Sequence, residues 1–409
     1  MKKLFLSIAF ISTVASILTA SSMSHPPLKA VLHEQINPKQ SFVMGCDVTV
    51  SHTTVGVFAI TASRKPQLIV SYKAATPDIK NLYEYMKNVM QDLSEHGITS
   101  IESTCFAVPG AVQQKRLFLH PHLPWSTSDD PQDIDDRSKR GLKKESLEQQ
   151  ASLKNVQIIN DFQAAAIGVQ ALPDSEITVL QQGTVVAKSR KLVVGAGNGL
   201  GAAILFWNES LQKYNPFDLN LSYTEYGAQT ELELKYFEFL KTQTGNVAWG
   251  KVLGTAAGIS TMYRFLHNYY SFAHHQPKGR YNNDPLINYE NNQYLEVFAN
   301  RHHSPRCKDA VDFYMAQYIR FLRNAIYAQV PRAGVYITNS VVQNNPELFN
   351  ASSGFLERLI HLDGIVLDPG SKTYLENYLK EIPIYLVTNK DIQLYGAAYA
   401  SIDPNVIQV

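Results

Sequence analysis

The chain has 409 residues, of which 45% are hydrophobic and 18% are charged, which is ample for a large core and for about two or three domains. The formal net charge is +1, and there is no long basic run and no interleaving of basic and aromatic residues, so the sequence favours a small-molecule partner over a nucleic acid. Cys46, Cys105 and Cys307 are too few and too scattered for a disulfide framework or a zinc site. We therefore predict three buried free thiols and no metal site.

Residues 1–22 have the layout of a secretory signal peptide, because Lys2 and Lys3 precede an apolar run that small polar residues follow. An uncleaved membrane anchor is an alternative that the modest length of the run disfavours. Translation starting at Met23 is a second alternative. The first two readings place the protein outside the cytosol, with any membrane contact confined to this segment, and the last places it in the cytoplasm.

The first half of the chain alternates predicted strands and helices. Residues 23–41 are polar and contain proline, which predicts a linker. Strands are predicted where short apolar runs occur, and the first two flank a polar tip and form a hairpin: 42–47, 54–60, 67–72, 104–108 and 156–159. Apolar residues at helical spacing predict helices at 82–93, ended by Gly97, and at 164–172. The charged stretch 126–150 is predicted to be a loop with an exposed helix.

The second half repeats this order. A hairpin at 192–206 is followed by further strands at 334–337 and 384–387. Helices are predicted at 229–241, 257–268, 308–329, 346–361 and 391–402. Residues 269–306 lack clear periodicity and are predicted to be a surface loop. A hairpin that leads into strand–helix units, present twice, indicates two related α/β lobes with a cleft between them.

The turn of the second hairpin carries glycines at alternate positions: Gly195, Gly197, Gly199 and Gly201. Glycines permit positive φ and a close approach of the backbone to a ligand, so successive N–H groups could cradle a phosphate. A tight turn between two core strands is the alternative. Because a strand rather than a helix follows the glycines, a Rossmann dinucleotide site is disfavoured.

Asn160 and Asp161 come directly after a predicted strand and before a helix. In an α/β sheet, ligands bind beyond the carboxyl ends of the strands. A carboxylate at that place can accept the proton of a substrate hydroxyl, which the neighbouring amide orients. The alternative is that Asp161 merely caps the following helix. A base in one lobe and a phosphate cradle in the next are the parts that a sugar kinase needs.

With these residues in view, the chain resembles the bacterial glucokinases, of the superfamily that contains sugar kinases and actin. The resemblance extends from about residue 43 to 400. It rests on blocks whose order and spacing match the family: Val-Pro-Gly-Ala-Val at 108–112, His-Leu-Pro-Trp at 122–125, Ile-Ile-Asn-Asp-Phe-Gln-Ala at 158–164, Gly-Ala-Gly-Asn-Gly-Leu-Gly at 195–201, Val-Leu-Gly at 252–254, Ile-Pro-Ile-Tyr-Leu-Val at 382–387 and Leu-Tyr-Gly-Ala at 394–397.

The resemblance implies an α/β fold of two RNase H-like lobes with an interlobe cleft. The lobes would be a small one at 42–171 and a large one at 172–389, with residues 390–409 returning to the small lobe as a helix. Matched residue by residue, Asp161 corresponds to the catalytic base, and Asn160 and Glu225 to hexose ligands. The residues implied to bind the nucleotide are Asp47, Gly195, Gly197, Asn198, Gly199 and Gly201. The cofactor would be ATP with Mg²⁺ arriving on the nucleotide, and a homo-oligomer is compatible with the family.

Four places depart from the family's pattern. Thr49, Val50 and Ser51 stand in the first phosphate loop, where the family has Gly-Gly-Thr. Ala228 stands where the family has a histidine, and Gly250 stands where it has a glutamate; in the family both side chains bind sugar hydroxyls. Thr-Asn-Ser at 338–340 replaces the small residues that lie beneath adenosine. The resemblance as a whole implies a hexose kinase, and these four departures point either to an altered substrate or to lost catalysis. The alternative is a non-catalytic sugar- or partner-binding protein on the same fold.

Overall fold

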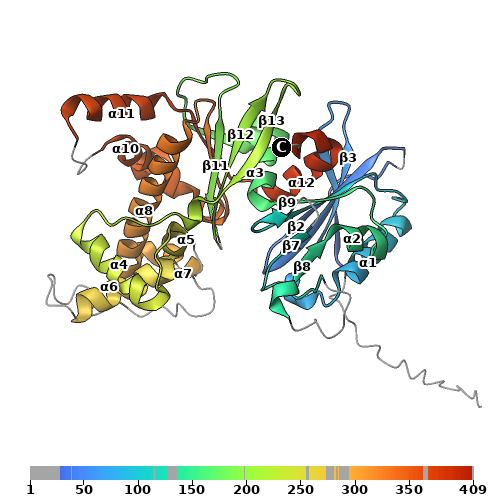
Figure 1. The fold of residues 1–409 in the computed structure, drawn as a ribbon, viewed down its shortest axis with the longest axis horizontal. Coiled ribbons are helices and arrows are strands. Elements are labelled where there is room, and N and C mark those ends of the chain that lie inside the picture. The colour runs from blue at the N-terminus through green and yellow to red at the C-terminus, as the bar shows by residue number, and fades with distance from the viewer. Residues whose placement is uncertain are drawn as a thin grey trace, which may run out of the picture.

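The computed structural model describes residues 28–37, 39–113, 117–127, 136–197, 199–254, 258–272, 281, 284, 294–362 and 367–407. The predicted signal segment and Asn198 lie outside these ranges, as does half of the loop predicted at 269–306. Two bodies, each built on a sheet, lie side by side with helices between them (Figure 1). None of the helices in the described ranges has the length and apolar character that a membrane-crossing segment needs.

The first sheet has six strands, which include all the strands predicted in the first half of the chain. In spatial order they are β1 (Ala30–Leu32), β4 (Pro66–Ala75), β3 (His52–Ile60), β2 (Phe42–Val48), β5 (Thr104–Val108) and β9 (Val156–Asn160). Neighbours from β1 to β2 are antiparallel, and β2, β5 and β9 are parallel. The edge strand β1 lies in the segment predicted to be a linker. Helices α1 (Leu82–Glu95) and α2 (Lys144–Gln150) and a small sheet of β6 (Val112–Gln113), β7 (Leu117–Leu119) and β8 (Gly141–Lys143) complete this body.

In five of its six strands, the second sheet repeats the order of the first sheet. Its strands are β13 (Lys213–Leu219), β12 (Leu200–Asn208), β11 (Lys191–Ala196), β14 (Val335–Thr338), β15 (Ile384–Val387) and β10 (Ile177–Gln181). In both sheets an antiparallel meander of three strands leads into a parallel run of three. The sixth strand differs: β1 pairs with the meander of the first sheet, whereas β10 pairs antiparallel with β15 at the opposite edge of the second. The prediction of two related α/β lobes is confirmed by this repetition.

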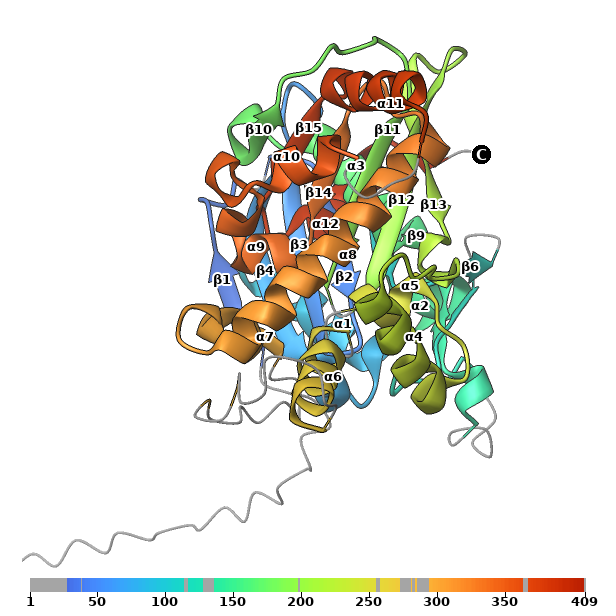
Figure 2. The same ribbon diagram turned by 90° about the vertical axis from the view of Figure 1, so that its left-hand side faces the viewer.

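Helices cover the face of the second sheet that points away from the first (Figure 2). Among them α8 (Pro305–Gln329) crosses that face, and its apolar residues are buried with those of β11 and β14. The others are α4 (Glu231–Thr244), α5 (Trp249–Leu253), α6 (Gly258–Phe272), α7 (Tyr294–Ala299), α9 (Ser340–Asn344), α10 (Phe355–Ile360) and α11 (Pro369–Glu381).

Two helices, α3 (Asp161–Ala171) and α12 (Ile392–Ile402), lie between the sheets (Figure 1). Their backbones touch: a Cβ placed on Gly396 would lie 1.8 Å from the carbonyl oxygen of Ala164, and one on Gly168 would lie 2.3 Å from that of Ile392. On one side α3 packs against the first sheet, and on the other its Phe162 packs against the second. These helices therefore join the two bodies.

The structure differs from the predicted elements mainly where local signals are weak. The helix predicted at 346–361 is replaced by two 3₁₀ turns and the short α10, because Gly354 has φ of 68° and interrupts the helical backbone. Helix α11 and strand β13 were not predicted. All three cysteines are buried free thiols, as the sequence predicts.

Candidate active site

Asn160 ends β9 and caps α3. Its Oδ1 accepts hydrogen bonds from the backbone N–H groups of Phe162 (2.8 Å) and Gln163 (3.2 Å), and Gln163 Oε1 accepts from the Asn160 N–H in return (3.3 Å). This reciprocal capping box starts the helix at Asp161 rather than at residue 164. Asn160 also donates from Nδ2 to the carbonyl oxygen of Gly110 (2.9 Å). The principal cap of α3 is thus Asn160, whereas Asp161 makes one local contact from Oδ1 to the Phe162 N–H (2.9 Å).

The carboxyl groups of Asp47 and Asp161 lie close enough to repel each other. Burial, and then the charge of Asp47, raise the pKa of Asp161 to about 7. Burial, and then the charge of Asp391 just before α12, raise the pKa of Asp47 to about 7, and Lys73 partly opposes this. A carboxyl group with a pKa near neutrality can take up a proton at physiological pH, as a general base must.

Asp391 and Lys73 are members of this electrostatic group that sequence reasoning missed. More than 300 positions separate Asp47 from Asp391 in the chain. Only the packing of α12 against β2 brings them together. A lone aspartate before a predicted helix reads as a helix cap, so the sequence holds no signal that would have found it.

The hairpin of β11 and β12 has the predicted shape, but its glycines are explained mostly by close approach. A Cβ on Gly201 would lie 2.0 Å from the Phe162 ring, and one on Gly195 would lie 2.8 Å from Asn339 Cβ. Gly195, Gly197 and Gly201 do not adopt the left-handed backbone that the sequence argument invoked. A Cβ on Gly199 would meet nothing within 4 Å. The open part of the predicted cradle is therefore Gly199, whereas Gly197 is buried and its N–H already donates to the carbonyl oxygen of Gly199 (2.7 Å).

The segment Thr338–Asn339–Ser340 lies directly against this hairpin. Asn339 has φ of 77° and ψ of 179°, a backbone conformation that is essentially reserved for glycine. Its Oδ1 accepts a hydrogen bond from Gln393 Nε2 on α12 (2.9 Å). A Cβ on Gly197 would lie 3.0 Å from Ser340 Oγ and 3.4 Å from Asn339 Nδ2. Side chains thus fill the layer between the hairpin and α12.

Glu225 lies on the large-lobe segment between β13 and α4, and its side chain is exposed. It forms an isolated antiparallel bridge with Ala248, just before α5. The next residue, Tyr226, is buried in the large-lobe core rather than turned outward. Gly250, where the family has a glutamate, lies against Ser222, whose carbonyl oxygen would be 3.0 Å from an added Cβ. A glutamate would therefore fit at 250 only if the Ser222 segment moved.

The turn after Asp47 is closed by its own hydrogen bonds. The Thr49 N–H donates to the His52 carbonyl oxygen (2.8 Å), and the His52 N–H donates to Thr49 Oγ1 (2.9 Å). Thr76 Oγ1 donates to the carbonyl oxygen of Thr49 (2.7 Å), which ties the turn to the end of β4. Two of the backbone N–H groups that could face a phosphate are thus already occupied.

Within the described ranges, no group of three or more histidine, cysteine, aspartate and glutamate side chains is arranged to hold a metal ion. Burial, and then the charge of Asp391, raise the pKa of Asp47, and a hard cation beside its carboxylate would oppose this shift. Mg²⁺ usually keeps several waters and is held by one or two carboxylates together with substrate phosphates. The residues present fit that mode of binding.

This arrangement of two repeated sheets, two joining helices and a carboxylate at the end of a central strand defines the actin-like ATPase fold of the sugar kinases. A glucokinase from Balamuthia mandrillaris, solved with glucose, matches with a TM-score of 0.66 and 15% identity over 88% of this chain and 94% of that one. A glucokinase of the ROK family from Streptomyces griseus, solved with glucose and AMPPNP, matches with a TM-score of 0.54 and 14% identity over 88% and 99%.

The sequence comparisons agree with the structural ones. The glucokinase family model matches residues 44–403, so the chain belongs to the glucokinase family. A glucokinase from Synechocystis sp. is 23% identical over 308 residues, which cover 73% of this chain and 79% of that relative. These findings give no support to the alternative of a non-catalytic binding protein.

Proposed function

We propose that the protein transfers the γ-phosphoryl group of ATP to the 6-hydroxyl of glucose or a related hexose. The observation that carries the proposal is Asp161, a partly buried carboxyl group with a pKa raised to about 7, at the carboxyl end of β9 in a chain of the glucokinase family. Such a group suits a hydroxyl nucleophile, which needs a base that is ionised near neutral pH.

In this proposal Asp161 accepts the proton of the hexose hydroxyl as its oxygen attacks the γ-phosphorus, and ADP leaves. Asn160 and Glu225 bind sugar hydroxyls. The nucleotide phosphates bind at the glycine-rich turn of residues 195–201, where Gly199 is exposed and offers space for a ligand. Asp47 is the residue that would face Mg²⁺, which neutralises phosphate charge when bound. Catalysis then consists of positioning and charge stabilisation.

The test is a direct assay of the purified protein with Mg-ATP and a panel of hexoses, with ADP release measured and the product identified by NMR. We expect hexose-dependent ADP release and a 6-phosphate product. Asp161→Asn should lower kcat by at least about 10²-fold, the usual contribution of a positioned base. Full activity of this variant would assign the base to another group, and the absence of turnover with every hexose would refute the proposed reaction.

A further inference from the structure

The segment that carries Glu225 is held on both sides by backbone hydrogen bonds. The Tyr226 N–H donates to the carbonyl oxygen of Val247 (3.1 Å), and the Trp249 N–H donates to that of Thr224 (3.0 Å). The exposed side chain of Glu225 lies between these two bonds along the chain. Its position therefore depends on where Tyr226 and Trp249 are fixed.

Both of these aromatic side chains are buried, and both lie against one guanidinium group. Their rings meet edge to face with centroids 5.1 Å apart. The guanidinium carbon of Arg320, on α8, lies 5.0 Å from the centre of the Tyr226 ring and 5.4 Å from that of the Trp249 ring. A cation over aromatic faces in a desolvated site is held firmly, since both contacts are stronger away from water.

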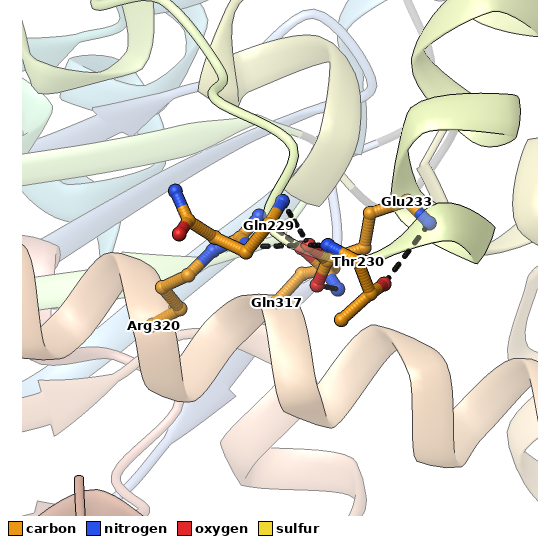
Figure 3. Close-up of polar contacts among 5 residues, drawn as sticks. All are labelled: Gln229, Thr230, Glu233, Gln317 and Arg320. Carbon is orange, nitrogen blue, oxygen red and sulfur yellow. Dashed lines mark hydrogen bonds and ion pairs between the residues drawn. The ribbon is translucent and has the colours of Figure 1, made fainter. Parts of the chain in front are cut away.

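Arg320 is itself held by a ring of hydrogen bonds that joins it to Glu233 and Gln317 (Figure 3). Its Nη1 donates to Glu233 Oε2 (2.6 Å) and its Nη2 to Gln317 Oε1 (2.7 Å), while Gln317 Nε2 donates to Glu233 Oε1 (2.8 Å). Glu233 Oε2 also accepts from the N–H groups of Gln229 (2.6 Å) and Thr230 (3.1 Å). The far end of the Glu225 segment is thus tied to the same cluster.

The ion pair in this cluster stays charged. Burial raises the pKa of Glu233, but hydrogen bonds from Gln317 and the Gln229 N–H, and the charge of Arg320, outweigh it and hold the pKa below its ordinary value. A buried ion pair of this kind adds little net stability, because desolvation offsets the attraction, but it selects one geometry. The capping box of α4 needs only Thr230 and Glu233, so helix capping does not account for Arg320.

We propose that Arg320 is a positioning residue for the hexose site: its guanidinium group holds the rings of Tyr226 and Trp249 in place and so determines the position of Glu225. This inference rests on the proposed function, because it gives Glu225 the role of a sugar ligand. In this proposal the large-lobe core contributes to sugar recognition through Tyr226, which stands where the family has glycine.

The experiment compares Arg320→Met and Arg320→Lys with Arg323→Met. Arg323 lies one turn further along α8, is buried, and donates instead to backbone carbonyl oxygens at the end of α10, including that of Leu359 (3.0 Å). Loss of Arg323 should therefore lower Tm without reaching the hexose site. Steady-state KM and kcat for glucose are measured together with Tm and with hydrogen exchange of residues 224–229.

We expect Arg320→Met to raise KM for glucose by about tenfold or more, with a smaller change in kcat, because a ground-state contact is lost. Arg320→Lys should recover part of the affinity, since it keeps the charge but not the planar fork. Exchange at residues 224–229 should be faster in both variants than in Arg323→Met. An unchanged KM, or equal exchange in the Arg320 and Arg323 variants, would overturn the proposal.

The exchange measurement separates this inference from the proposed function. If the wild-type protein turns over no hexose, the proposed reaction fails while exchange still reports whether Arg320 fixes the segment. If Arg320→Met does not fold, Arg320→Lys supplies the same comparison, because it keeps a cation beneath the two rings.

Discussion

The carboxyl groups of Asp47 and Asp161 repel each other, and this repulsion links the protonation of one to the charge of the other. Burial is the largest cause of both raised pKa values; the charge of Asp47 adds to the shift of Asp161, and the charge of Asp391 adds to that of Asp47. The pair is coupled, so a change at Asp47 should be visible in the titration of Asp161. This coupling leads to one prediction for activity and one for stability.

We predict that kcat/KM rises with pH through about 7 as Asp161 loses its proton and becomes able to act as a base. Asp47→Asn removes a charge that raises the pKa of Asp161, so the acid limb of the profile should move to lower pH. The measurement is log(kcat/KM) against pH for both proteins. The two proteins are compared by the pH at the midpoint of the acid limb, because the maximum activity can change for other reasons. The same midpoint in both proteins would show that the two carboxyl groups are not coupled.

The same pKa shift predicts that Asp161→Asn stabilises the fold at high pH. Folding raises the pKa of this aspartate from 3.8 to about 7. Its ionisation therefore lowers the free energy of unfolding as pH rises between these two values and has no further effect above the upper one. An amide does not titrate. The Tm of the variant relative to wild type should therefore increase between about pH 4 and about pH 7 and then level off. A Tm difference that is the same at all pH values would contradict this assignment of the shift.

Asn339 stores strain at the edge of the predicted nucleotide site. Its backbone conformation costs roughly 1–3 kcal/mol for a residue other than glycine, whereas its hydrogen bond with Gln393 contributes about 0.5–1.5 kcal/mol. We predict that Asn339→Gly raises Tm, because the relief of strain exceeds the lost hydrogen bond. Gln393→Ala is the control, since it removes the bond and leaves the strain, and it should lower Tm. A glycine variant less stable than wild type would mean that the side chain of Asn339 outweighs its strain.

Among the secondary-structure elements, the β11–β12 hairpin contains glycines of two kinds: some are needed for close packing, and one has open space beside it for a ligand. An alanine at 201 would meet the ring of Phe162, next to Asp161, while an alanine at 199 meets no atom within 4 Å. We predict that Gly201→Ala destabilises the fold by about 1–3 kcal/mol, as overpacking of a core does. Gly199→Ala should leave Tm unchanged and weaken the binding of Mg-ATP in a calorimetric titration. Unchanged Mg-ATP affinity in that variant would move the phosphate site away from this turn.

The start of the joining helix α3 shows how the roles of Asn160 and Asp161 differ. Either residue type is a good helix cap, so residue type alone does not choose between them. The capping box depends on Gln163 three positions beyond Asn160, a spacing that is visible in the sequence and that would have indicated Asn160 as the cap. A cap and a sugar ligand are compatible roles for Asn160 because Nδ2 carries two hydrogens, and the bond to Gly110 uses one of them.

At the scale of the whole molecule, the sequence predicted the elements with strong periodicity and the repeated order of the two halves. The strands of both hairpins and the parallel strands are rich in apolar residues, so local pattern was sufficient for them. Strand β13 contains a proline and polar residues, and its pairing comes from β12 rather than from its own composition. Helix α11 has little buried surface, with Leu379 as its one buried residue, so no apolar stripe marked it.

The site was predictable only as far as its parts lie in contiguous motifs. Asp161 and the hairpin glycines belong to such motifs. Arg320 lies within a long helix whose pattern indicates only a helix, and its partners come from three other segments of the chain. Contacts between distant segments carry no local signal, and they became visible only with the fold.

The backbone contact between α3 and α12 should make a mutational library behave differently under selection for abundance and under selection for activity. Gly168 and Gly396 lie so close to backbone atoms of the opposite helix that any side chain would force the helices apart, whatever the protein catalyses. A deep mutational scan read out by cellular abundance should therefore deplete every substitution at these positions, yet enrich amides at Asp161. The same library selected for growth on hexose should deplete all three positions alike. The gap between the two readouts would map the residues that chemistry requires apart from those that the architecture requires.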